Sequence, residues 1–296
     1  MNGISDWFPA GPPIREEQQV GRLPFIEGLE QRMLGADKVK LLENRRTGKS
    51  SVGQAVIARF RAADRPGGRV DLSPQPDPAR AARELAEQLA PSLAVMGKAK
   101  QATGWLAALW ARLSPDSEEA VIGEVVLGLL GEQPLIGSVL ERCSEAIAGQ
   151  NAAILIDEAH LIADWPADQQ ASLREFLRND ERIGVIVSSS LASALERLTG
   201  EDGPLRYVGQ RLPIPPIDRG DWEAALPARF DAVGAPIDLD ALGLLLDESR
   251  GHPYCTMLLC RASARAGLPG GHTEIAAVSA GLLEVREDEG WQLRDA

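Results

Sequence analysis

The sequence predicts an α/β fold in which a parallel sheet with crossover helices is followed by a purely helical region. Up to about residue 211, short apolar runs with strand character alternate with helical patterns, which is typical of a parallel sheet. Beyond residue 218 the apolar spacing is helical only. The segment Leu212–Asp218 lies between the two regions and contains three prolines, so we place a domain boundary near residue 215.

The first region is expected to hold four strands and three helices. Its clearest strand is a continuous apolar run, AAILI, at Ala152–Ile156. In chain order the expected elements are the strand Val39–Leu42, the helix Ser50–Ala62, the strand Arg69–Leu72, the helix Ala79–Leu89, the strand Ala152–Ile156, the helix Gln169–Leu177 and the strand Ile183–Ser188.

The second region is expected to hold four helices and a short terminal β-hairpin with Gly290 in its turn. Its elements are the helices Asp221–Val233, Asp238–Ser249, Pro253–Ala266 and Thr273–Leu283 and the hairpin Leu282–Leu293. We therefore divide the chain into an irregular N-terminal arm (1–19), a core (20–215), a helical lid (216–270) and a final helix with hairpin (271–296).

Composition and charge limit the classes of function. The chain has 296 residues, of which 44% are apolar and 25% charged, with a net charge of −12. Residues 151–296 carry 13 arginines and no lysine against 24 acidic residues. Because non-specific binding to duplex DNA draws on many Lys and Arg contacts with phosphates, we expect the isolated chain to bind duplex DNA weakly or not at all.

The sequence favours a reduced, cytoplasmic protein. No apolar run reaches the roughly 18 residues that a membrane span needs. The first residues, MNGISDWFPAGPP, lack the basic and then apolar layout of a secretory signal. The three cysteines, Cys143, Cys255 and Cys260, are too few and too irregularly spaced for a disulfide framework or a zinc knuckle. We interpret Cys255 and Cys260 as small buried apolar residues.

A phosphate-binding pattern lies between the first expected strand and the first expected helix. The segment Glu43–Ser51 reads ENRRTGKSS, and its last part matches the P-loop pattern G-x-x-x-x-G-K-S/T. Gly48 lets the backbone curl so that its amides face phosphate oxygens, and Lys49 supplies a positive charge to the β- and γ-phosphates. The Ser50 hydroxyl is a ligand type that Mg²⁺ accepts. Glu43 stands where the pattern has its first glycine, and a carboxylate there opposes phosphate unless it points away.

A second pattern completes a nucleotide site of the P-loop NTPase type. In ILIDEAH, at Ile154–His160, two acids directly follow the apolar run of the buried strand, as in a Walker B motif. Parallel sheets bind ligands at the carboxyl ends of their strands, and Asp157 falls at such an end. There Asp157 would hold Mg²⁺ through water, and Glu158 would polarise the attacking water.

These motifs, with three others, resemble the AAA+/STAND-type P-loop ATPases, and especially a predicted ATP-binding family first described largely from archaea. The resemblance covers about residues 18–265. Besides ILIDEAH it rests on a G-R box at Val20–Glu30, the loop Arg45–Ser51, the strand end VIVSSS at Val185–Ser190, and RGHPYCTMLL at Arg250–Leu259. The GHPY sequence is the most specific of these, because Gly-x-Pro at this place is typical of the STAND branch.

The resemblance implies roles for individual residues. Val20, Gly21 and Arg22 would lie at the adenine base, and Ser190 would act on the γ-phosphate as a polar sensor. His252 would reach phosphate from the lid. The implied catalytic residues are Glu158, Lys49 and Ser190. The implied metal ligands are Ser50 and Asp157. The implied nucleotide-binding residues are Val20, Gly21, Arg22, Arg45, Arg46, Thr47, Gly48, Lys49, Ser50, Ser51, His252 and Pro253.

The sequence also departs from this family. Only a short tail follows the lid, where the family commonly has a winged-helix domain, so Gly281–Ala296 looks like the closing wing of such a domain. Its acids Glu287, Asp288 and Glu289 disfavour contact with phosphate. No sensor-two arginine is evident, since Arg250 does not match by spacing.

We therefore predict an ATPase that binds Mg-ATP and hydrolyses it slowly, as a conformational switch with a protein partner or in a homo-oligomer. One alternative is an adaptor that binds ATP or ADP without turnover. Another is a helper ATPase associated with DNA, of the kind that serves transposition or replication initiation.

Overall fold

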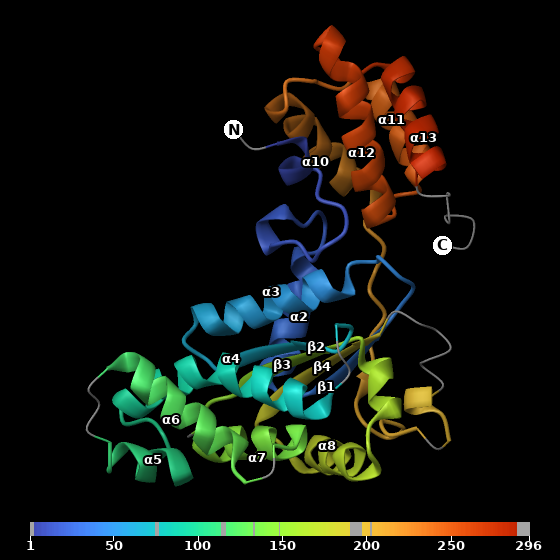
Figure 1. The fold of residues 1–296 in the computed structure, drawn as a ribbon. Helices are drawn as coiled ribbons and strands as arrows, with labels where there is room; N and C mark the ends of the chain where they lie inside the picture. Colours follow the sequence, from blue (N-terminus) through green and yellow to red (C-terminus); the bar gives the residue numbers. More distant parts are fainter. Residues whose placement is uncertain are drawn as a thin grey trace. The chain divides into compact units, whose positions relative to one another are not determined.

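The computed structural model describes residues 3–74, 77–113, 117–132, 134–147, 149–189, 197–201 and 203–288 (Figure 1). Within it the chain forms two compact units. The first contains Met1–Phe25, Asn44–Ser51 and Ile214–Ala296. The second contains Ile26–Glu43 and Val52–Pro213.

The second unit is built on a five-stranded parallel sheet with the order β2-β3-β4-β1-β5. Its strands are β1 (Lys38–Leu42), β2 (Gly67–Asp71), β3 (Ala152–Asp157), β4 (Ile183–Ser189) and β5 (Gln210–Arg211). Every residue of β3 and β4 is buried, as expected for strands covered on both faces. The predicted α/β fold with a parallel sheet is therefore confirmed.

Helices cover both faces of the sheet (Figure 1). On one face, Gly53 of α3 (Lys49–Ala62) lies against Leu155, and Met33 of α2 (Leu23–Leu34) lies against Gly184. On the other face, Leu85 and Leu89 of α4 (Pro78–Lys98) lie against β2. The same face is covered by α7 (Ile136–Ala146) and α8 (Ala167–Asn179), and the 3₁₀ helix η2 (Ala159–Asp164) follows β3.

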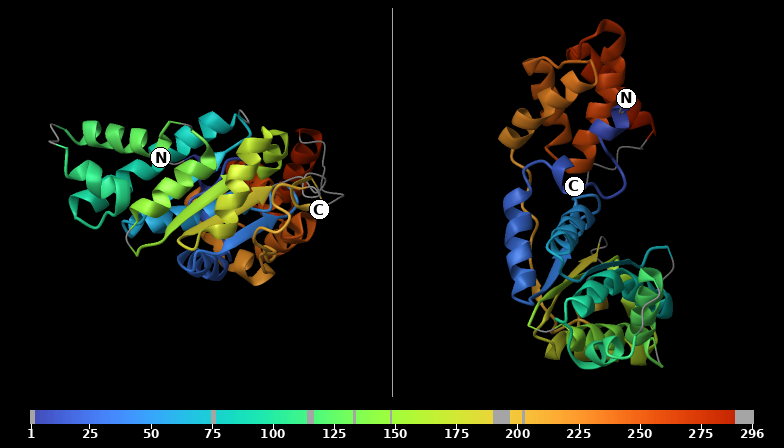
Figure 2. Two further views of the ribbon diagram at one scale, coloured as in Figure 1. Left: turned by 90° about the horizontal axis from the view of Figure 1, so that it is seen from below. Right: turned by 90° about the vertical axis from the view of Figure 1, so that its left-hand side faces the viewer.

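Two further helices, α5 (Gly104–Trp110) and α6 (Glu118–Leu130), widen this second layer. They pack on α4 and α7 rather than on the sheet, as the two further views show (Figure 2). The Trp105 indole donates to the Arg142 carbonyl at 2.8 Å, and Trp110 fills the space left by Gly97 in α4.

The first unit is helical, as predicted for the region after residue 218. Its elements are α1 (Ile4–Trp7), η1 (Glu16–Gln18), α10 (Arg219–Ala232), α11 (Leu239–Ser249), α12 (Pro253–Gly267), η3 (Leu268–Gly270) and α13 (Ile275–Asp288). The N-terminal residues belong to its core, since fully buried Phe8 lies 4.8 Å from the Phe230 ring. The Arg229 guanidinium donates to the Gln18 carbonyl at 2.7 Å.

The hairpin prediction needs correction where the structure describes it. Residues 282–288 continue α13 as a helix instead of forming the first arm of a hairpin. Val278, Leu282 and Val285 are all buried, and their spacing of four and three residues matches one face of a helix. Residues 289–296, including Gly290, lie outside the described residues.

Candidate nucleotide-binding site

The loop between β1 and α3 is curled around one backbone carbonyl. Arg46 and Gly48 have positive φ angles of 65° and 94°, which turn successive peptide groups. Lys49 is 5% exposed, and its ammonium donates to the Asn44 carbonyl at 2.5 Å. The Thr47 hydroxyl donates to the same carbonyl at 3.1 Å. The positive charge of Lys49 is thus already held against the loop.

Glu43, which precedes this loop, is directed toward an arginine of the second unit. Its carboxylate lies 3.9 Å from the Arg211 guanidinium of β5, which also donates to the Leu42 carbonyl at 3.0 Å. Glu43 is not among the described residues with positive φ, so its backbone does not require glycine. The carboxylate therefore has a cation beside it, although Arg211 is 60% exposed and the pair is weak.

The G-R box contacts the loop and the proline-rich joint. Arg22 is 5% exposed, and its guanidinium donates to the Pro215 carbonyl and, at 3.4 Å, to the Thr47 carbonyl. Burial lowers the pKa of Arg22 to about 10. Val20 is buried in the core of the helical unit. Arg22 therefore holds together three segments that are far apart in the sequence.

Gly21 gives a test of how closely the box is packed. Its φ is 62°, and a Cβ there would meet the Asp221 side chain. We expect Gly21→Ala to lower the free energy of unfolding by about 1–3 kcal/mol, from positive φ and the steric clash together. Denaturant unfolding measures this change. Gly220→Ala is the control, because Gly220 lies in α10 without a positive φ, and a Cβ there would meet no described atom within 4 Å apart from its chain neighbours and the backbone of its own helix. An equal loss there would contradict the tight-packing argument.

The start of α12 also contacts the loop. Pro253 is the first residue of the helix and His252 caps it, which suits the fixed φ of proline. The Arg46 guanidinium lies over the Tyr254 ring, 3.8 Å from its centre. Such a cation–π contact is favourable by about 0.5–2 kcal/mol. The sequence resemblance assigns no role to Tyr254.

His252 lies among positive charges of the same unit. Burial lowers its pKa, and Arg46, Arg22 and Lys49 lower it further, whereas a hydrogen bond with the Arg45 backbone raises it. The net direction favours the neutral imidazole. A neutral ring acts on phosphate as a hydrogen-bond donor rather than as a charge. Its Nδ1 lies 3.2 Å from the sulfur of buried Cys255.

The N-terminal arm reaches the residue after the GKS sequence. The Ile14 amide donates to the Ser51 hydroxyl at 3.1 Å, and the Gln19 side-chain amide donates to the Ser51 carbonyl at 3.0 Å. No local pattern indicates these contacts, because the partners are more than 30 positions apart. Ser51 therefore anchors the arm to the beginning of α3. Ser50, the preceding residue, is partly buried.

In the second unit, Asp157 ends β3 inside a set of hydrogen-bond donors. Its side chain is 5% exposed. One carboxylate oxygen lies 3.2 Å from the Arg69 guanidinium, and the other accepts from the buried Ser188 hydroxyl and, at 3.2 Å, from the Glu158 amide. The sequence motifs did not indicate Arg69 or Ser188. Both lie on strands that flank β3, and only the register of the sheet brings them to Asp157.

Glu158 follows in a left-handed backbone conformation with a φ of 53°. Its carboxylate is 25% exposed and lies 3.3 Å from Nδ1 of His160, which is also 3.4 Å from the Ser189 hydroxyl. Glu158, the acid that we assigned to water activation, is therefore partly exposed at the carboxyl edge of the sheet, with His160 beside it. Ser190 lies outside the described residues.

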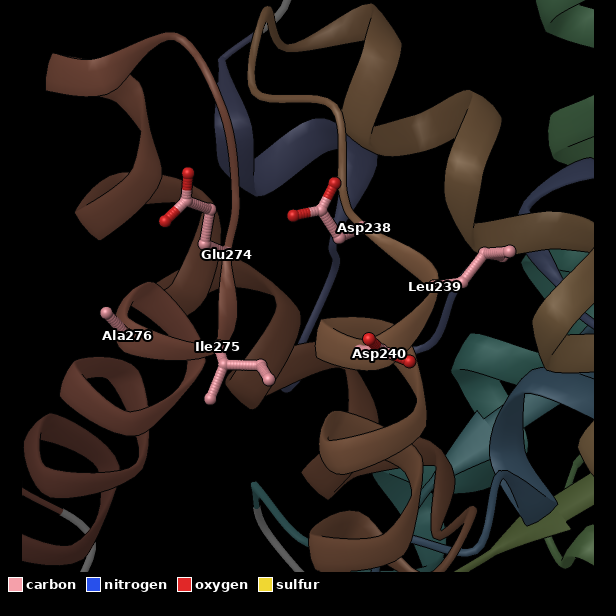
Figure 3. Close-up of a pocket in the computed structure, with 6 residues that line it drawn as sticks. All are labelled: Asp238, Leu239, Asp240, Glu274, Ile275 and Ala276. Carbon is pink, nitrogen blue, oxygen red and sulfur yellow. The ribbon is translucent and has the colours of Figure 1, made fainter.

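A separate hollow in the helical unit is lined by none of the predicted site residues (Figure 3). Its carboxylates, Asp238, Asp240 and Glu274, lie at the starts of α11 and α13, and Leu239, Ile275 and Ala276 also line it. Acids at helix N-termini are favoured by the helix dipole, which accounts for this cluster. No group of His, Cys, Asp and Glu in the described residues could hold a metal ion by itself.

Two further sequence expectations concern the cysteines and membranes. All three cysteines are buried, as interpreted for Cys255 and Cys260, and none forms a disulfide within the part of the chain that the structure describes. Burial raises the pKa of Cys143 to about 12. Among the described residues, the structure contains no helix with the length and apolar character of a membrane span.

No protein-family model matches the chain, and no curated protein matches it. Solved structures do. A Walker-type ATPase of Pyrococcus abyssi matches with a TM-score of 0.63 and 18% identity, over 98% of this chain and 79% of that chain. The Aeropyrum pernix Orc1 protein in complex with DNA matches with a TM-score of 0.59 and 19% identity, over 96% of this chain and 70% of that chain. The Thermotoga maritima RuvB Holliday junction branch migration motor matches with a TM-score of 0.54 and 12% identity, over 94% of this chain and 74% of that chain.

These similarities show a fold. The chain has an α/β P-loop NTPase fold, with a helical region after the sheet. At identities below 20% they do not carry over activity, partners or site residues.

Proposed function

We propose that this protein binds Mg-ATP and hydrolyses it slowly, using the nucleotide as a conformational switch. The observation that carries the proposal is the position of two motifs on one parallel sheet. β1 leads directly into the loop that holds Lys49, and β3 ends at Asp157. The strands are separated only by β4 and run the same way, so both motifs follow carboxyl ends, where α/β sheets bind ligands.

The residues present fit ATP and Mg²⁺ chemically. A curled loop with a lysine at the start of a helix suits phosphates. A serine hydroxyl at Ser50 and a carboxylate at Asp157 are oxygen ligands of the kind that Mg²⁺ prefers, directly or through water. When bound, Mg²⁺ would neutralise negative charge on the phosphates.

The other roles follow from this assignment. Lys49 would hold the β- and γ-phosphates together with the amides of the loop. The Glu158 carboxylate would orient a water molecule and accept its proton. Ser190 would contact the γ-phosphate, and His252 would donate to phosphate from the start of α12. Val20, Gly21 and Arg22 would lie near the base, and Pro253 would belong to the nucleotide site beside His252.

Contacts inside the first unit support the switch. Arg46 of the loop stacks on Tyr254 of α12, and the Arg45 backbone bonds to His252. A phosphate bound by the loop would compete for the Arg46 guanidinium and for the His252 ring. The loop would thereby pass its nucleotide state to α12, and from there to a protein partner or to a second copy of the chain.

Binding and turnover are tested separately. Titration of a fluorescent ATP analogue with and without Mg²⁺ measures binding, and release of inorganic phosphate at saturating ATP measures turnover. Saturable binding with slow, Mg²⁺-dependent release supports the proposal. The absence of binding at millimolar nucleotide would overturn it.

An adaptor without turnover is the second candidate, and the pairing of Glu158 with His160 favours it, because a carboxylate engaged by a histidine is less available to water. Saturable binding of ATP with no phosphate release above that of a Glu158 variant would select the adaptor.

A helper ATPase on DNA is the third candidate, since the Orc1 structure is a complex with DNA and RuvB is a branch migration motor. We expect the isolated chain to bind duplex DNA weakly or not at all. The reason is its net charge of −12 and the absence of lysine after residue 100. Titration of fluorescent duplex at low salt, with and without Mg-ATP, measures this. Micromolar binding that falls steeply toward physiological salt would promote the DNA-helper function instead.

A further inference from the structure

The carboxylate that would meet the metal is already paired with a fixed positive charge. Arg69 of β2 places one nitrogen, Nη2, 3.2 Å from Oδ2 of Asp157 and 3.2 Å from Oδ2 of Asp71. The two aspartates end neighbouring strands and are partners in the register of the sheet. A single arginine nitrogen is thus shared by two carboxylates at the carboxyl edge.

The rest of the guanidinium is held loosely. Its Nη1 reaches the Gln54 side chain only at 3.4 Å, and its buried Nε has no hydrogen-bond partner among the described residues. A well-anchored structural arginine would use these donors, since buried N–H groups are normally bonded. Arg69 would therefore lose little besides the bond to Asp157 if it moved away from that residue.

Asp71 is a second carboxylate with which the Arg69 guanidinium can pair. Its side chain is 34% exposed, against 5% for Asp157, so a guanidinium on Asp71 alone would be partly in water. Asp71 is itself held by the Ser73 amide, which donates to its other oxygen at 2.9 Å. Asp157 is therefore a buried carboxylate suited to a metal, and Asp71 is a fixed carboxylate that can stay paired with Arg69.

We propose that Arg69 is a positioning residue and that its pairing with Asp157 sets how much Mg²⁺ the nucleotide site needs. Asp157 would be the residue that holds Mg²⁺ when it binds, and Arg69 would then remain paired with Asp71. Two positive groups at one carboxylate repel each other, so Arg69 weakens the binding of the metal whether or not it moves fully. Arg69 also keeps the buried Asp157 paired when no metal is present. This inference rests on the proposed function.

The test measures the free Mg²⁺ that gives half of the Mg²⁺-dependent increase in binding of a fluorescent ATP analogue. We expect Arg69→Gln to lower this concentration about tenfold or more, which corresponds to about 1.4 kcal/mol of repulsion removed. Arg69→Lys keeps the charge and is expected to stay within about threefold of wild type. Arg83→Gln removes an exposed arginine of α4 and controls for net charge.

A second variant tests the inference independently in case Arg69→Gln does not fold. Asp71→Asn removes the alternative place for Arg69, so it is expected to raise the Mg²⁺ requirement several-fold. An unchanged or higher Mg²⁺ requirement in a folded Arg69→Gln protein would overturn the inference, as would a lower requirement in Asp71→Asn. If wild type binds the analogue and only these shifts are missing, the inference fails alone. If wild type binds no analogue under any condition, the proposed function fails as well.

Discussion

Lys49→Ala is expected to weaken ATP binding more than about 100-fold while the fold survives. Hydrogen bonds to charged groups contribute about 1.5–3 kcal/mol each, and Lys49 would make two, to the β- and γ-phosphates. In the structure its ammonium is already held against the Asn44 carbonyl within the loop, so little entropy is lost when phosphate arrives. Binding of a fluorescent ATP analogue measures the change.

The fold is tested in the same samples. Water can replace the ammonium of Lys49 at the Asn44 carbonyl, so the melting temperature without nucleotide should change by only a few degrees. Lys98→Ala removes an exposed lysine at the end of α4 and should bind ATP as wild type does. Equal stabilisation of wild type and Lys49→Ala by Mg-ATP would place the phosphates elsewhere.

The sheet could be predicted because its signals are local. Each of the four longer strands contains apolar residues next to a turn or a helix start, and β3, with a continuous apolar run, shows this most clearly. The two-residue β5 was missed, since its residues Gln210 and Arg211 are exposed and carry no apolar pattern. Of the helices around the sheet, α2, α6 and α7 were not predicted, and α6 packs on α4 and α7 rather than on the sheet.

The motif residues could also be predicted because their sequence patterns are local. The residues that contact them in the structure could not. Gly48, Lys49 and Asp157 stand in short patterns with fixed spacing. Arg69 reaches Asp157 across 88 positions, and Arg211 reaches Leu42 across 169. Such pairs depend on strand order and register, which a single sequence does not reveal. The tail shows the opposite error, because a local turn signal at Gly290 was given more weight than the helical spacing of Val278, Leu282 and Val285.

Glu158→Gln is expected to preserve ATP binding and to lower the rate of phosphate release about 100-fold or more. A positioned general base contributes about 10²–10⁴ to a rate, and glutamine keeps the size of the side chain but cannot accept the proton. Asp157 is untouched, with Arg69 and Ser188 still beside it, so the metal ligand remains. Single-turnover phosphate release and analogue binding measure the two effects independently.

The comparison with Asp164→Asn decides whether the loss is specific. Asp164 ends η2 six residues further on and pairs with Arg197, and it is 56% exposed. Removing its charge changes the local field without touching Glu158, so turnover should stay near that of wild type. Equal phosphate release by wild type and Glu158→Gln would assign the proton to another group. A loss of binding in Glu158→Gln would instead mean that the charge of the Glu158 carboxylate is itself needed to hold the nucleotide or its metal.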